Sequence, residues 1–141
     1  MITRRQFNFG AAGSIAAGAS PLSALAAAPT QDALVIDAMG EVREVYTDEL
    51  CREMIDSGLN SITVTLCDPK SYEAVAYQWA IDGVLTYNRL IEGESEFWTR
   101  ATTVADIDRA RLEGRIAIFY LFQNSTQFGR NLDNVEVFYG L

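Results

Sequence analysis

The chain has 141 residues, and 11 lysines and arginines against 19 aspartates and glutamates give it a formal net charge of −8. This acidic balance argues against nucleic acid or an anionic membrane surface as a partner and favours a soluble protein. Hydrophobic residues make up 49% of the chain, which is typical of a packed domain rather than a disordered one. Histidine, the commonest metal ligand and general base in proteins, is absent.

The N-terminus has the pattern of an export signal. Arg4 and Arg5 are followed by Phe7, and this trio is the core of the twin-arginine signal, which the export machinery reads as an address. The next residues are almost uncharged and rich in Ala, Gly and Ser. Their glycines, together with Pro21, make them a poor membrane-spanning helix, so we expect no stable membrane span after cleavage.

Small residues mark the end of this segment. Ala24-Leu25-Ala26 fits a cleavage site, and cleavage after Ala28 is the alternative. We therefore predict a signal peptide over residues 1–26 and one mature domain over residues 27–141, located in the periplasm or outside a bacterial cell. An uncleaved N-terminal anchor is the alternative interpretation of the same residues.

Three strands and four helices are predicted in the mature chain. Compact runs of apolar and β-branched residues predict the strands, and capping residues followed by apolar positions at helical spacing predict the helices. In chain order these are a strand at 33–37, a helix from Thr47 to Gly58, a strand at 61–66, a helix from 71 to 91, a helix from Thr103 to Gly114, a strand at 116–122 and a helix at 133–139.

Burial is predicted from the same patterns. The first strand reads as buried, with the Asp37 carboxylate at its C-terminal end. In the first helix the apolar face is expected to contain Leu50, Met54 and Ile55. In the second helix it is expected to contain Val75, Ile81, Val84, Leu85 and Ile91.

The order β-α-β-α-α-β-α is typical of a parallel α/β sheet covered by helices. Three strands cannot close a barrel, and a complete (β/α)₈ barrel needs about 250 residues. We therefore interpret the mature chain as the N-terminal portion of a (β/α)₈ TIM-like barrel, a self-contained small α/β domain being the alternative. On this interpretation the chain alone is expected to be inactive and to aggregate, because sheet edges and apolar faces are left uncovered.

Reactive residues of parallel α/β folds gather where the strands end. Three segments qualify, namely residues 37–41, 67–68 and 123–127. Cys51 and Cys67 can form one disulfide bond in an oxidising compartment, although two free thiols are the favoured interpretation. Cys67 is not supported as a nucleophile, because no histidine is present to activate it.

Residues 35–41, 107–117 and 121–124 together resemble the N-terminal half of the membrane dipeptidase (renal dipeptidase) family, whose members are barrel-fold metallopeptidases of the amidohydrolase superfamily. The resemblance covers nearly all of the mature chain in order and at suitable spacings. It implies a centre of two zinc ions that hydrolyses a dipeptide or a similar small amide with a metal-activated water.

The family's metal-ligand positions are substituted in this chain. The first strand of the family supplies a histidine and an aspartate, where this chain has Met39 and Glu41. The third supplies a glutamate that bridges the metals, where this chain has Gln123. The resemblance thus implies Glu41 as a zinc ligand, with one ion, two ions or none bound, and Asp37 and Asn124 as possible polar residues at the mouth of the site.

Each of these residues also has a simpler interpretation. Glu41 can be a solvated loop acid, and Met39 is favoured as a packing residue at the barrel mouth. Gln123 can make hydrogen bonds to backbone or substrate rather than to metal, and Asp37 can accept hydrogen bonds from loop amides. The function hypotheses are therefore an exported metallohydrolase and, alternatively, a non-catalytic protein that binds a small ligand on the same scaffold. Histidines at later strand ends would favour the hydrolase. An unrelated exported α/β domain is a third reading.

Replacing Arg4 and Arg5 by lysine should retain the precursor in the cytoplasm, because the pair is read as an address rather than as charge. Cell fractionation of the full-length protein measures this, with Arg43→Lys as a matched control outside the signal. Normal export of the double-lysine variant would contradict the signal assignment.

Overall fold

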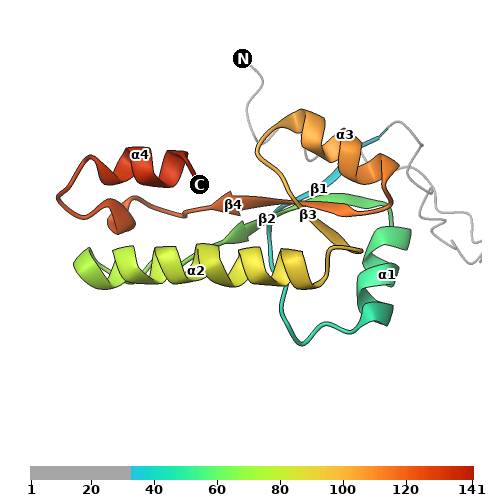
Figure 1. Cartoon of the computed structure of the whole chain (residues 1–141), viewed down its shortest axis with the longest axis horizontal. Coiled ribbons are helices and arrows are strands. Elements are labelled where there is room, and N and C mark those ends of the chain that lie inside the picture. The colour runs from blue at the N-terminus through green and yellow to red at the C-terminus, as the bar shows by residue number, and fades with distance from the viewer. Residues whose placement is uncertain (1–32) are drawn as a thin grey trace, which may run out of the picture.

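The structure is a computed structural model that describes residues 33–141, so the predicted signal with Arg4, Arg5 and Phe7 lies outside the described residues. Four parallel strands form one sheet in the order β1-β2-β4-β3 (Figure 1). The strands are β1 (Val35–Gly40), β2 (Leu59–Thr65), β3 (Trp98–Arg100) and β4 (Ile116–Leu121). The helices are α1 (Asp48–Asp56), α2 (Glu73–Gly93), α3 (Val104–Leu112), α4 (Asn134–Tyr139) and the short 3-10 helix η2 (Thr126–Phe128).

Helices cover both faces of the sheet, α1 and α2 on one face and α3 and α4 on the other (Figure 1). Successive side chains of β4 point to opposite faces, as the pleat requires. Ile116 and Ile118 belong to the larger hydrophobic core with α1 and α2, whereas Ala117 and Phe119 pack with α3. None of the helices within residues 33–141 is long and apolar enough to cross a membrane.

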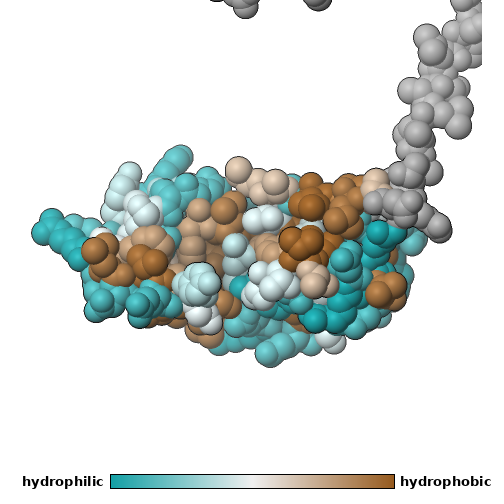
Figure 2. Space-filling view, turned by 90° about the horizontal axis from the view of Figure 1, so that it is seen from above, coloured by the Kyte–Doolittle hydropathy of each residue, from teal (hydrophilic) through white to brown (hydrophobic). Residues whose placement is uncertain are grey.

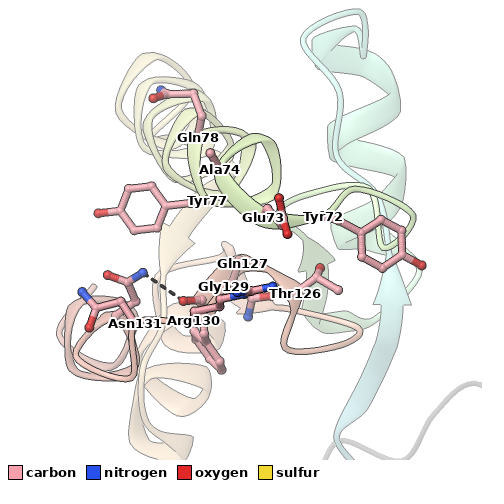
Figure 3. A pocket seen from close by; sticks show the side chains of 12 residues that line it. Tyr72, Glu73, Ala74, Tyr77, Gln78, Thr126, Gln127, Gly129, Arg130 and Asn131 are labelled. Atoms are coloured by element: carbon pink, nitrogen blue, oxygen red, sulfur yellow. Dashed lines mark hydrogen bonds between the residues drawn. The ribbon is translucent and has the colours of Figure 1, made fainter.

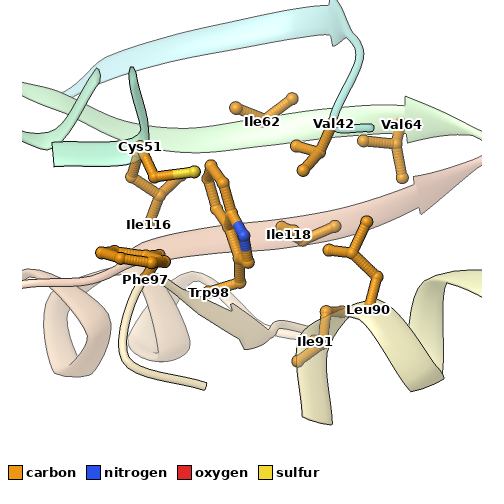
Figure 4. Close-up of a cluster of buried hydrophobic side chains, with 10 residues drawn as sticks. All are labelled: Val42, Cys51, Ile62, Val64, Leu90, Ile91, Phe97, Trp98, Ile116 and Ile118. Carbon is orange, nitrogen blue, oxygen red and sulfur yellow. The ribbon is translucent and has the colours of Figure 1, made fainter. Parts of the chain in front are cut away.

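Trp98 is the largest fully buried side chain among the described residues and lies at the centre of the larger core (Figure 4). Its indole Nε1 donates a hydrogen bond to Glu94 Oε2 at 2.8 Å, so its one polar atom is satisfied. Cys51 from α1, Ile62 from β2 and Leu90 from α2 belong to the same core. The tryptophan thus joins elements that are far apart in the sequence.

The prediction of three strands is wrong, because β3 adds a fourth parallel strand beside β4. Its three residues pair with Ile116, Ala117 and Ile118. A run of three residues is too short to show a period-two pattern, and it directly follows Phe97, which is buried in the core. The observed element order is therefore β-α-β-α-β-α-β-α, with η2 before the last helix.

The prediction for the first strand is also wrong in its bounds and burial. The strand runs to Gly40, so Asp37 lies within it and Glu41 follows its end. Val35 is 37% exposed and Ile36 is 50% exposed, because β1 pairs only with β2 among the described strands. Other apolar residues are exposed as well, and on the face shown in Figure 2 they are interspersed with hydrophilic residues.

The helix caps are confirmed, whereas the predicted buried faces are shifted. Thr47 Oγ1 accepts from the Leu50 amide, and the side chains of Thr103 and Asp106 form a capping box. The predicted second helix begins at Glu73 rather than 71. In α1 the predicted Met54 and Ile55 do pack half-buried against the core, but Leu50 is exposed and Cys51 is the buried residue. In α2 the predicted Val84 and Ile91 are buried, whereas Val75 and Leu85 are exposed. The other buried residues of α2 are Ala76, Ala80 and Leu90. Small residues were missed because they carry little hydrophobic signal, although they allow close packing.

Gly83 shows how close this packing is. A Cβ atom at Gly83 would collide with the backbone carbonyl of Leu66, the residue after β2 and before the loop at the sheet's carboxyl edge. At Gly93, in the same helix, a Cβ atom would meet nothing within 4 Å. The first glycine therefore sets the distance between α2 and the end of β2.

Gly83→Ala should lower the free energy of unfolding by about 1–3 kcal/mol, because backbone must move to admit the methyl group. Gly93→Ala is the matched control and should raise it by up to about 1 kcal/mol through helix propensity alone. Chemical denaturation of the full-length protein measures both. Equal effects of the two substitutions would contradict the close approach at Gly83.

Candidate functional site

A cavity of about 410 Å³ lies at the carboxyl edge of the sheet. It is lined by residues at, or just after, the carboxyl ends of three parallel strands and by one residue of α2. Its lining residues are Met39, Gly40, Glu41, Thr65, Cys67, Asp68, Pro69, Tyr87 and Gln123. Met39, Glu41 and Gln123, which were singled out in the sequence, therefore line the same cavity. We call it the mouth cavity.

Glu41 is an exposed carboxylate held by a neighbouring cation. Arg43 Nε donates to Glu41 Oε2 at 2.7 Å, and the guanidinium and carboxylate also form an ion pair. The hydrogen bond and charge of Glu41 raise the pKa of Arg43 above its usual range. Tyr46 donates to the Glu41 backbone carbonyl at 3.5 Å. Glu41 is thus oriented at the rim while its side chain stays 62% exposed.

Gln123 and Asn124 tie the loop after β4 to β2 and the loop that follows it. Gln123 Nε2 donates to Thr65 Oγ1 at 3.1 Å, which joins the ends of β4 and β2. Asn124 Nδ2 donates to the Pro69 carbonyl at 2.7 Å. Asn124 Oδ1 accepts from the Thr126 hydroxyl and amide at 2.7 and 3.0 Å. Asn124 is therefore a structural link beside the mouth cavity.

Met39 lines the mouth cavity from an exposed position, whereas Asp37 lies outside the cavity. The Met39 side chain is 64% exposed, so the favoured expectation that it packs at the mouth is wrong within the described residues. It lies on β1, which is an edge strand among the strands that the structure describes. Asp37 Oδ1 accepts from the Met39 amide at 3.1 Å, and Asp37 does not line the mouth cavity.

Two further residues of the mouth cavity carry ionisable groups. Burial, followed by the charge of Asp68, raises the pKa of the Cys67 thiol, so this thiol is protonated at neutral pH and a poor nucleophile. Burial also raises the pKa of Tyr87, which leaves its hydroxyl a hydrogen-bond donor. Sequence reasoning missed Tyr87, because it lies mid-helix and only the packing of α2 brings it to the strand ends. Both Cys51 and Cys67 are free thiols.

The donor set of the mouth cavity fits a metal ion only in part. Glu41 and Asp68 offer carboxylates, but Asp68 Oδ1 already accepts from the Lys70 amide at 2.8 Å. Met39 offers a thioether and Gln123 a neutral amide, both weak ligands for zinc. Within residues 33–141 no group of three or more His, Cys, Asp or Glu side chains is arranged to hold a metal.

Comparison with solved structures finds a crystal structure of an amidohydrolase from Pseudomonas aeruginosa, with a TM-score of 0.63 and 27% sequence identity. The similarity covers 77% of this chain and 31% of that protein, so the chain spans less than a third of the length of its neighbour. No protein-family model matches the chain, and no curated protein matches it in sequence. The chain has an amidohydrolase-like fold, and its parallel sheet is consistent with part of a TIM-like barrel.

Asn124→Asp should lower the free energy of unfolding by about 1 kcal/mol at neutral pH, because a carboxylate cannot donate to the Pro69 carbonyl. The loss should shrink as the pH falls through about 4, where the introduced carboxyl regains a proton. Asn131→Asp is the matched control, since Asn131 only accepts locally, from the Asp133 amide. Denaturation curves of the full-length protein at several pH values measure the effect, and equal losses in both variants would contradict the cross-loop role of Asn124.

Proposed function

We propose that the protein is an exported hydrolase that cleaves a dipeptide or a similar small amide with a metal-activated water. One observation carries the proposal: on an amidohydrolase-like fold, Met39, Glu41 and Gln123 converge on one cavity at the ends of parallel strands. The finer assignment to the membrane dipeptidase family rests on the sequence resemblance, and periplasmic or secreted location rests on the twin-arginine pattern.

Glu41 is the described residue best suited to hold zinc, through a carboxylate oxygen at the cavity rim. A zinc ion bound there would lower the pKa of a coordinated water and supply hydroxide at neutral pH. Asp68 is the other carboxylate of the cavity, although its Oδ1 already accepts from the Lys70 amide. Because Met39 and Gln123 replace a strong nitrogen donor and a negative charge, we expect fewer than two zinc ions per chain.

The chain's own side chains would position the substrate. Thr65 holds the Gln123 amide by its nitrogen, which leaves the Gln123 carbonyl oxygen to accept from a substrate N–H. The Tyr87 hydroxyl, kept protonated by burial, can donate to a substrate carbonyl. Arg43 holds the Glu41 carboxylate in one orientation. Together these groups would fix an amide bond in the mouth cavity.

The alternative is a binding protein that holds a small ligand in the same cavity without hydrolysing it. The observation that favours it is the neutral Gln123 amide, which is already bonded to Thr65 where a metal bridge would need a negative charge. Binding of a dipeptide without turnover, in a preparation that contains zinc, would select this function.

The metal proposal predicts zinc content. Gln123→Glu combined with Met39→His should raise the zinc bound per full-length chain, because the pair restores one charge and one strong nitrogen ligand. Dipeptide hydrolysis should rise with it if the remaining ligands are in place. Elemental analysis of the purified protein before and after dialysis measures the first effect.

Two matched variants control this experiment. Gln78→Glu adds the same charge on an exposed side chain outside the mouth cavity and should leave zinc content unchanged. Glu41→Gln should lower zinc affinity at least tenfold, whereas Glu44→Gln should not. Two tightly held zinc ions in the unmodified protein would show that Met39 and Gln123 are wrongly assigned to metal positions.

A further inference from the structure

A second cavity, of about 980 Å³, lies between the first turns of α2 and the loop after β4 (Figure 3). Tyr72, Glu73 and Tyr77 line it from the side of α2, and Gln127 and Arg130 line it from the loop. It shares no lining residue with the mouth cavity. Its size is in the range of cavities that bind small molecules. We call it the Gln127 cavity.

Gln127 is the unusual residue of this cavity. Its side chain is 1% exposed, and neither Nε2 nor Oε1 has a hydrogen-bond partner within residues 33–141. A buried amide without partners is costly, and such groups are rare in folded proteins. Ser61 Oγ also lacks a partner, but it lies in the β2–β4 ladder opposite Ala117 and lines neither cavity. Gln127 therefore keeps both a donor and an acceptor unpaired in the wall of this cavity.

The donor and acceptor of the Gln127 amide limit which ligand group can form hydrogen bonds with both of them. The Gln127 amide presents N–H and C=O side by side, so it pairs by two hydrogen bonds with a group that presents C=O and N–H in the same way. A primary carboxamide does this. A trans peptide bond does not, because its N–H and C=O point in opposite directions. A carboxylate has no donor for Oε1 and would leave that atom unpaired.

Charges of both signs line the same cavity. Arg130 and Glu73 are exposed, and neither takes part in an ion pair with another described residue. Glu73 has a φ of 54°, an uncommon conformation for a residue with a side chain. An arginine suits a carboxylate and a glutamate suits an ammonium group. The cavity thus offers three different groups to one small molecule.

We propose that the Gln127 cavity binds a compact zwitterion that ends in a primary carboxamide. The carboxamide pairs with Gln127, the carboxylate with Arg130 and the ammonium group with Glu73. Tyr72 and Tyr77 supply apolar surface for the carbon chain between them. The proposal does not depend on metal binding or hydrolysis at the mouth cavity.

The probes are L-glutamine and L-glutamate, which differ only in carboxamide against carboxylate. Titration calorimetry on the full-length protein should show glutamine binding with a Kd below about 1 mM and glutamate binding at least tenfold more weakly. Failure of glutamine to bind, or equal affinity for both probes, would overturn the proposal. Neither outcome depends on zinc content, so the proposal for the Gln127 cavity can be wrong while the proposal for the mouth cavity is right, and the reverse.

Gln127→Leu supplies a second, independent readout. It keeps the side-chain volume while removing both unpaired polar atoms, so it should abolish glutamine binding and raise the thermal midpoint of the free protein. If Gln127 were only structural, the same change would lower the midpoint, and that result would overturn the proposal.

Arg130→Gln tests the site without touching the buried residue. It removes the carboxylate partner from an exposed position and should weaken glutamine binding at least tenfold at unchanged thermal stability. Arg111→Gln is its matched control, an exposed arginine on α3 that does not line the cavity, and should bind as the unmodified protein does. Equal binding by both arginine variants would contradict the assigned role of Arg130.

Discussion

The parallel ladder between β2 and β4 runs in register from the Ser61–Ala117 pair to the Thr65–Leu121 pair. Parallel strands end at the same edge, so the loops that follow them must leave the sheet side by side. The contact between Gln123 and Thr65 is a direct consequence of this register. A slip of one residue would turn every side chain of β4 to the opposite face and separate the residues of both cavities.

The loop after β4 separates the two cavities. At its start Gln123 faces the mouth cavity, and further along Gln127 and Arg130 line the Gln127 cavity. Asn124 holds the loop between them through the Pro69 carbonyl. A loop anchored in this way can present polar side chains on two sides without collapsing onto the sheet.

In the described part of the chain, the polar atom of Trp98 in the core is hydrogen-bonded, whereas one buried polar group that lines a cavity is not. In the core the indole of Trp98 is bonded to Glu94, and apolar residues surround it (Figure 4). After β4 the Gln127 amide is buried without a partner among the described residues, whereas the Glu41 carboxylate is bonded by Arg43 while staying exposed. Proteins commonly keep an unpaired buried group like the Gln127 amide where a ligand binds, at some loss of stability.

The sequence by itself determined the parallel α/β class, the caps at Thr47 and Thr103 and the loops that carry candidate site residues, because these depend on local hydrogen bonds and on hydrophobic period. It did not reveal β3, a three-residue strand stabilised by pairing with β4. Nor did it reveal the small-residue face of α2, the place of Tyr87 in the mouth cavity or the burial of Gln127. Those features depend on contacts between segments that are far apart in the sequence, and the local residue pattern of one segment does not show which other segment it will contact.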